Sequence, residues 1–326
     1  MSVQVEKMKP YLFLLSILLS FIACGNTASI ENDQEIKEYH KTIEVKHENK
    51  MGISIYYSEE GKPKPMIFYL SASVSDRHSY EHIYHYLVKR GYTVIGLSTE
   101  SFASDFMTYH FYDAITYARK ICQAKKIGDE RKIGLAGHSS GAGVLPSLAY
   151  KLFVKDQLGK EGRFIFGSAP WIDFQFEKHM RLPHDTNFVT QVFINDASTD
   201  PRIYLDMYKL MDVDHKTFII LKEGANHRTP FYDEPKALVE KGIYEPLANL
   251  AAFTFFHEEK EKIFPHKDSI TQMMTIEADG SLPSNEDYLM ILNKFRDSGS
   301  PYGCKTTAEY VANPREKECL NYKNEL

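Results

Sequence analysis

Short apolar runs alternate with longer stretches of helical periodicity through the middle of this chain, and this alternation limits its fold more than any other feature. The apolar runs predict strands at residues 66–70, 92–97, 132–136, 163–167, 189–194 and 217–221. The periodic stretches predict helices at residues 80–89, 111–126, 143–154 and 203–211. Because strand and helix follow each other in this order, we expect an α/β fold with a mostly parallel sheet flanked by helices.

Both flanks of this region depart from the pattern. Before it, residues 42–46 and 51–57 predict two strands around a turn. After it, the longest periodic piece spans residues 236–256, and Pro235 directly before it suits the start of a helix. The remaining C-terminal residues predict helices and irregular segments rather than a continued alternation.

The N-terminal residues resemble a targeting segment rather than part of the fold. Lys7 and Lys9 precede an apolar run that ends at Ala23, a pattern typical of a secretory signal peptide and too short for a membrane span. Residues 21–26 resemble a bacterial lipobox, in which Cys24 is lipid-modified and becomes the new N-terminus. This interpretation places the protein at a bacterial cell envelope, anchored by lipid to a membrane and facing the periplasm or exterior. The alternative is an ordinary signal peptide cut near Ala23, which leaves a soluble secreted protein.

These observations give an expected layout for the whole chain. It comprises a signal peptide at residues 1–23, a polar tether at 24–40, a core at 41–257 and a helical or irregular C-terminal extension at 258–326. Within the extension, Cys304 and Cys319 could form a disulfide in an oxidising compartment or remain two free thiols. Cys122 falls in a helical pattern and is expected to be a small core residue.

The charge balance argues against a nucleic-acid partner. The chain has 39 Lys and Arg against 44 Asp and Glu, which gives a formal net charge of −5. A protein that binds nucleic acid normally carries a basic face that neutralises phosphates. We therefore expect no nucleic-acid partner.

The sequence Gly137-His138-Ser139-Ser140-Gly141 is the motif that points to chemistry. It follows an expected strand and opens an expected helix, which is the structural context that gives G-x-S-x-G its meaning. So tight a turn forces the serine into strained backbone dihedrals and lifts the Ser139 hydroxyl clear of the sheet. The N–H of Ser140 then points toward the place where an oxyanion would develop.

With this motif, residues 40–257 resemble the α/β-hydrolase superfamily, and most closely the bacterial secreted serine esterases of the cutinase and dienelactone-hydrolase kind. The resemblance implies that Ser139 is the nucleophile and that the backbone N–H groups of Ala72 and Ser140 form the oxyanion hole. It also implies that Trp171 lines the substrate pocket. The sequence departs from the family pattern at Ser71, where glycine is frequent.

The family order is serine, then acid, then histidine, and both partners follow expected strands. Asp196 and Asp200 compete for the acid. Asp200 directly precedes Pro201, which suits a helix N-cap, whereas Asp196 lies at the family position. We therefore favour Asp196 and keep Asp200 as the alternative. His227 follows the strand expected at 217–221 and is the expected general base.

Other polar clusters are weaker. His78, His82 and His85 recur on one helix face, a spacing that can present imidazoles to a metal, but the sequence identifies no further ligand. We expect neither a metal nor a cofactor.

The resulting expectation is a serine hydrolase that cleaves a small-molecule or lipid ester through an acyl-enzyme. Two alternatives stay open. One is a lipid deacylase, thioesterase or peptidase that uses the same triad. The other is a surface lipoprotein of this fold that binds a partner without catalysis.

Overall fold

The computed structural model describes residues 35–45, 49–59, 61–100, 106–173, 175–177, 179–222, 224–232, 235–258 and 271–274, together with Glu286, Met290 and Ile291. The predicted signal peptide, Cys24, Cys304 and Cys319 lie outside these residues. Within the described ranges, no helix has the length and apolar character needed to cross a membrane.

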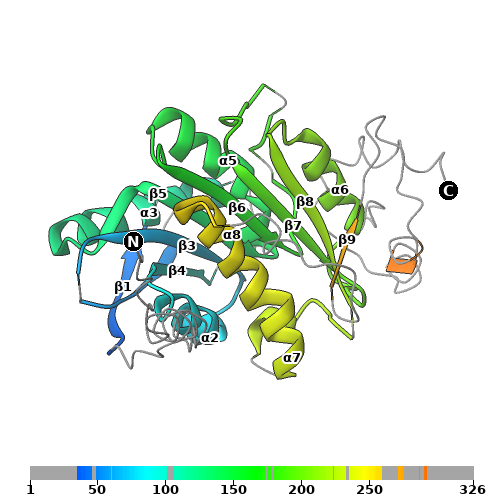
Figure 1. Cartoon of the computed structure of the whole chain (residues 1–326), viewed down its shortest axis with the longest axis horizontal. Helices are drawn as coiled ribbons and strands as arrows, with labels where there is room; N and C mark the ends of the chain where they lie inside the picture. The colour runs from blue at the N-terminus through cyan, green and yellow to red at the C-terminus, as the bar shows by residue number, and fades with distance from the viewer. Residues whose placement is uncertain are drawn as a thin grey trace, which may run out of the picture. The chain divides into compact units, whose positions relative to one another are not determined.

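In the described part of the chain, nine strands form one sheet in the order β1-β2-β4-β3-β5-β6-β7-β8-β9 (Figure 1). The strands are β1 (Lys37–Glu44), β2 (Lys50–Tyr57), β3 (Lys64–Ser73), β4 (Thr93–Thr99), β5 (Gly128–His138), β6 (Gly162–Ser168), β7 (Asn187–Phe193), β8 (His215–Leu221) and β9 (Thr271–Met274). Strands β3 to β8 run parallel, whereas the pairings β1–β2, β2–β4 and β8–β9 are antiparallel. The prediction of a mostly parallel sheet is therefore confirmed.

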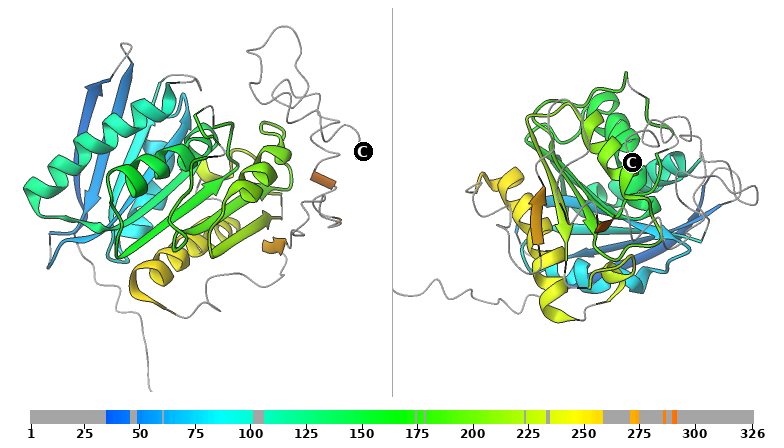
Figure 2. Two further views of the ribbon diagram at one scale, coloured as in Figure 1. Left: turned by 90° about the horizontal axis from the view of Figure 1, so that it is seen from above. Right: turned by 90° about the vertical axis from the view of Figure 1, so that its right-hand side faces the viewer.

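Helices cover both faces of this sheet (Figures 1 and 2). The α-helices are α2 (Glu81–Val88), α3 (Met107–Lys125), α4 (Ser140–Gly143), α5 (Leu145–Ala149), α6 (Pro201–Leu210), α7 (Lys236–Val239) and α8 (Glu245–Phe256). There are also two 3₁₀ helices, η2 (Arg77–Tyr80) and η4 (Thr229–Phe231), and two π-helical segments, η3 (Tyr150–Lys155) and η5 (Glu240–Tyr244), among the described residues. Helices α2, α7 and α8 pack on one face, and α3 and α5 pack on the other.

The alternation of side chains along the central strands explains the two cores. In β3, Ile67 belongs to the core that also holds Leu87 of α2 and Leu250 of α8. The next residue, Phe68, belongs to the opposite core with Phe111 of α3. Because both faces are covered, these strands are apolar almost throughout, which is why their positions could be predicted.

Cys122 of α3 is fully buried in the core on the α3 face. The prediction that it is a small core residue is confirmed.

Two predicted boundaries are wrong. Strand β1 begins at Lys37, inside the segment expected to be a tether up to residue 40. Most β1 residues are exposed or half-buried, so the strand lacks an apolar pattern that would reveal it. In the C-terminal extension, residues Thr271–Met274 add strand β9 to the edge of the sheet beside β8. A four-residue strand is too short for its periodicity to stand out.

Candidate active site

Ser139 occupies a strained turn between β5 and α4. Its φ is +55°, a region that non-glycine residues rarely adopt. The turn also needs glycines, because a Cβ at Gly141 would collide with the backbone carbonyls of Leu70 and Ser71 in β3. A Cβ at Gly137 would lie only 3.0 Å from the Leu70 carbonyl oxygen. The close approach of β3 therefore dictates the small residues of the G-x-S-x-G motif.

Backbone hydrogen bonds hold this turn in place. The Ser139 N–H donates to the Ser168 carbonyl at the end of β6, at 3.0 Å. The Ser139 carbonyl accepts from the N–H of Gly143 at 2.9 Å and from the N–H of Trp171 at 2.8 Å. The strained residue is thus fixed by its own helix and by the neighbouring strand and loop.

The structure brings Ser139, His227 and Asp196 together in one chain of hydrogen bonds. His227 Nε2 lies 3.0 Å from Ser139 Oγ, and His227 Nδ1 lies 2.9 Å from Asp196 Oδ2. The three residues follow β5, β8 and β7, and parallel strands place their carboxyl ends at the same edge of the sheet. Because an ionised carboxylate only accepts, Nδ1 carries the proton and Nε2 accepts from the Ser139 hydroxyl.

Asp196 is buried, and its negative charge is met by several donors. Its Oδ1 accepts from the N–H groups of Ser198 at 2.7 Å and Thr199 at 3.1 Å. Its Oδ2 accepts from the Thr199 hydroxyl at 2.8 Å as well as from His227. These bonds fix the carboxylate and offset the loss of hydration that burial imposes.

Asp200, the alternative acid, has a structural role in this geometry. It is the N-cap of α6, where its Oδ1 accepts from the Arg202 N–H at 3.0 Å, and it forms a salt bridge with the Arg202 guanidinium. The contact to His227 Nδ1 comes from Asp196. The structure therefore favours Asp196 as the residue that orients the imidazole.

The expectation for Ala72 is contradicted. Its N–H donates to the hydroxyl of Tyr80 at 3.0 Å, and Tyr80 is fully buried. That N–H is therefore engaged inside the protein and does not face an oxyanion. The neighbouring Ser73 contacts the turn after Ser139 instead, since its N–H and its hydroxyl both lie within 2.8 Å of Ser140 Oγ. Ser140 is the first residue of α4, so its own N–H has no acceptor within the helix.

Sequence reasoning missed Tyr80, which also contacts His138, the residue before Ser139. Tyr80 Oη lies 2.9 Å from Nδ1 of His138. The buried His138 ring packs 4.8 Å from the His227 ring, centroid to centroid. Burial lowers the pKa of His138 well below its ordinary value, and the charge that His227 can carry lowers it further. His138 is therefore an uncharged ring that packs against His227 rather than a second base.

Trp171 contacts the turn at Ser139 through its backbone N–H, and its role in lining a pocket stays a prediction.

Asp173, two residues after Trp171, is a second residue that sequence reasoning missed. It is buried and accepts from the Ser147 N–H and hydroxyl, both at 2.9 Å, and from the Gln175 N–H at 3.0 Å. Burial raises the pKa of the Asp173 carboxyl to about 6 despite these bonds. Asp173 thus ties the Trp171 loop to α5.

The histidines of α2 and the turn before it have separate partners. His78 Nδ1 lies 3.0 Å from Glu81, His82 Nδ1 lies 2.7 Å from the Tyr244 hydroxyl, and His85 Nε2 lies 3.4 Å from Glu38. Among the described residues, no group of three or more His, Cys, Asp or Glu side chains is arranged to hold a metal ion.

No family model matches this chain, and a search of curated proteins found no match either. Its function is therefore inferred from the residues and geometry of the site.

The pKa of Asp173 predicts a pH-dependent contribution to stability. Its folded-state pKa of about 6 exceeds the ordinary value of about 3.9, so the folded state binds the proton more tightly than the unfolded state. The wild type should lose on the order of 1 kcal/mol of unfolding free energy relative to Asp173→Asn as pH rises from about 5 to 7.5. Urea unfolding of both proteins at several pH values measures this difference. A difference that is constant with pH would contradict the assignment.

Proposed function

We propose that this chain is a serine hydrolase of the α/β-hydrolase fold that cleaves carboxylic esters through an acyl-enzyme. The observation that carries the proposal is the continuous hydrogen-bond chain from Asp196 through His227 to Ser139. A serine, a histidine and a buried carboxylate in this arrangement form an activated nucleophile, whatever the surrounding fold.

The α/β-hydrolase fold is supported by where these residues lie. Ser139 stands at a strand-to-helix turn at the carboxyl end of β5, a central strand of the sheet. Asp196 and His227 follow β7 and β8, so the chain order is serine, acid, histidine. This order and the strained serine turn are the features that define the fold's active sites.

In the proposed reaction, Ser139 Oγ attacks the ester carbonyl carbon while its proton passes to His227 Nε2. The imidazolium that forms is stabilised by Asp196, which keeps its own charge. The carbonyl oxygen becomes an oxyanion, which the Ser140 N–H would bind in this proposal. The C–O bond then breaks, and the leaving alkoxide takes the proton from His227. Water repeats the sequence on the acyl-enzyme and releases the carboxylic acid.

Catalysis accounts for features that a binding surface does not require. A non-glycine residue in a sparsely populated backbone region costs about 1–3 kcal/mol, and such residues cluster at active sites. Ser139 bears this strain and is at the same time hydrogen-bonded to His227. We therefore prefer an enzyme to a non-catalytic lipoprotein of the same fold.

The proposed location is the bacterial cell envelope, with the chain attached by lipid at Cys24. Its support is the sequence pattern of a basic start, a short apolar run and small Ala23 before the cysteine. Acyl chains would hold the protein at a membrane, because each buried CH₂ contributes about 0.8 kcal/mol.

The first prediction for this function is covalent labelling at Ser139. A fluorophosphonate should modify Ser139, located by peptide mass mapping that separates it from Ser140. Ser139→Ala should abolish labelling and lower ester hydrolysis by more than about a thousandfold. Its thermal unfolding should match the wild type, because the hydroxyl contributes little to packing. Residual hydrolysis above that level would point to another nucleophile.

The second prediction separates the two aspartates. Asp196→Asn should lower kcat by roughly 10³–10⁴-fold, because His227 loses the partner that fixes its tautomer. Asp200→Asn is the matched control. It removes the charge that pairs with Arg202 and should lower the melting temperature, while kcat of the folded enzyme stays within a few-fold of wild type. Steady-state kinetics with p-nitrophenyl acetate tests both, and a reversed pattern would exchange the assignments.

The third prediction concerns Cys24. Expressed in a bacterium with its own N-terminal segment, the wild type should partition into the detergent phase, and mass spectrometry should find acyl chains on Cys24. Cys24→Ser should not mature in this way. An unmodified mature N-terminus in the wild type would leave a soluble secreted esterase.

A further inference from the structure

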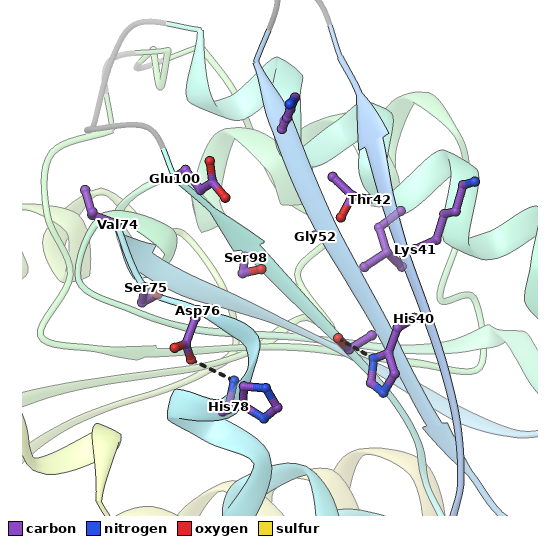
Figure 3. A pocket seen from close by; sticks show the side chains of 13 residues that line it. His40, Lys41, Thr42, Gly52, Val74, Ser75, Asp76, His78, Ser98 and Glu100 are labelled. Carbon is purple, nitrogen blue, oxygen red and sulfur yellow. Dashed lines mark hydrogen bonds between the residues drawn. The ribbon is translucent and has the colours of Figure 1, made fainter.

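A cavity of about 380 Å³ lies beside the loop that follows β3 (Figure 3). Its walls are this loop, the facing parts of β1 and β2, and the end of β4. Ser73 contacts Ser140, the residue after the proposed nucleophile, and the next residue, Val74, lines the cavity. The loop after β3 therefore contacts the turn that holds Ser139 and also lines the cavity.

The floor of the cavity depends on a glycine. Gly52 of β2 stands opposite Ser98 of β4, and a Cβ at Gly52 would collide with the Ser98 hydroxyl. Glycine is unfavourable inside a strand and often marks a place that needs close approach or open space. Here it leaves room for the Ser98 hydroxyl at the base of the cavity.

Polar groups with unused hydrogen-bonding capacity converge on this space. Within the described part of the chain, no hydrogen bond or ion pair engages the side chains of Thr42, Lys50, Ser98 or Glu100. They offer ammonium and hydroxyl donors as well as hydroxyl and carboxylate acceptors. A ligand that both donates and accepts would satisfy this mixture.

The loop also presents an apolar contact in a strained conformation. Val74 has φ +56° and is 56% exposed, although positive φ is a genuine outlier for a β-branched residue. The loop is held in this conformation from both ends. Ser73 bonds to Ser140, and the Ser75 hydroxyl donates to the Ala72 carbonyl at 2.7 Å. Such strain, kept on an exposed residue, is characteristic of functional positions.

The lining argues against several classes of ligand. Lys50 is balanced by Asp76 and Glu100, and these carboxylates would repel a phosphate or another anion. Val74 is the apolar side chain that the described lining presents to the cavity, too little for a long acyl chain. Among the described residues that line the cavity, no Phe, Tyr or Trp could stack on a nucleobase. A neutral polyol offers hydroxyls to the polar groups and C–H faces to Val74.

We propose that this cavity binds the alcohol portion of the ester and that this alcohol is a sugar. The inference rests on the proposed ester hydrolysis at Ser139. In the reaction, Ser139 Oγ bonds to the acyl carbon and the C–O bond to the sugar breaks. The sugar oxygen takes the proton from His227 and leaves as a neutral hydroxyl.

The test compares three acetyl esters of primary alcohols, so that the acyl group and leaving-group type are matched. They are 6-O-acetylglucose, ethyl acetate and O-acetylserine. For the full-length wild type, kcat/KM for 6-O-acetylglucose should exceed that for each of the other two at least about tenfold. Ser98→Ala and Glu100→Gln should each lower the ratio of the sugar ester to ethyl acetate about fivefold or more. Gly52→Val, which fills the floor of the cavity, should remove the preference for 6-O-acetylglucose over ethyl acetate.

Glu161→Gln, at the opposite end of the strands, is the matched control and should keep the wild-type ratio. Fluorophosphonate labelling of Ser139 checks the triad in every variant. A wild-type ratio near one, or a ratio that none of the cavity variants changes, would overturn the subsite while ethyl acetate hydrolysis still supports the esterase. A preference for O-acetylserine would overturn the sugar in favour of a zwitterionic alcohol. No labelling and no hydrolysis of any ester would instead reject the proposed function itself.

Discussion

The backbone of Ser139 is the constraint on which the rest of the site depends. Its positive φ would relax in an isolated turn, but Ser168 at the end of β6 and Trp171 in the following loop hold it by backbone hydrogen bonds. On the other side, Gly141 lets the carbonyl groups of β3 approach closely. The turn is thus fixed by both strands that neighbour β5. Because it cannot relax, the Ser139 hydroxyl stays at the sheet edge, where it meets His227.

A layer of buried polar groups beneath the site turns this local constraint into a fixed arrangement of loops. Asp196 gathers donors from its own loop and from His227, Asp173 ties the loop after β6 to α5, and Tyr80 connects the β3 loop to His138. Buried polar groups are costly unless they are hydrogen-bonded, so each contact specifies one loop position over others. Ser139 and His227 are therefore oriented mainly by residues outside the proposed catalytic pair.

Much of this arrangement could be predicted, for physical reasons that also mark the limits. Ser139, Asp196 and His227 each come shortly after an apolar strand, and parallel strands gather such positions at one edge. Ala72 was placed wrongly, because its N–H direction depends on how the β3 loop bends and on a tyrosine eight residues further on. No local pattern encodes that contact. Strand β1 was placed too late for a related reason, since an exposed edge strand has no apolar face to reveal it.

Because of the strand order, the proposed catalytic residues and most residues of the proposed sugar site belong to different strands. Because β3 lies between β5 and β4, the loop that follows β3 contacts Ser140 through Ser73 and lines the cavity through Val74. A substitution in this loop would change the position of Ser140 and the shape of the cavity together. Residues of β1 and β2 line the cavity from strands that pair with neither β3 nor β5. On this architecture, substrate preference can change through Thr42 or Lys50 while the strained serine and its hydrogen bonds keep their geometry.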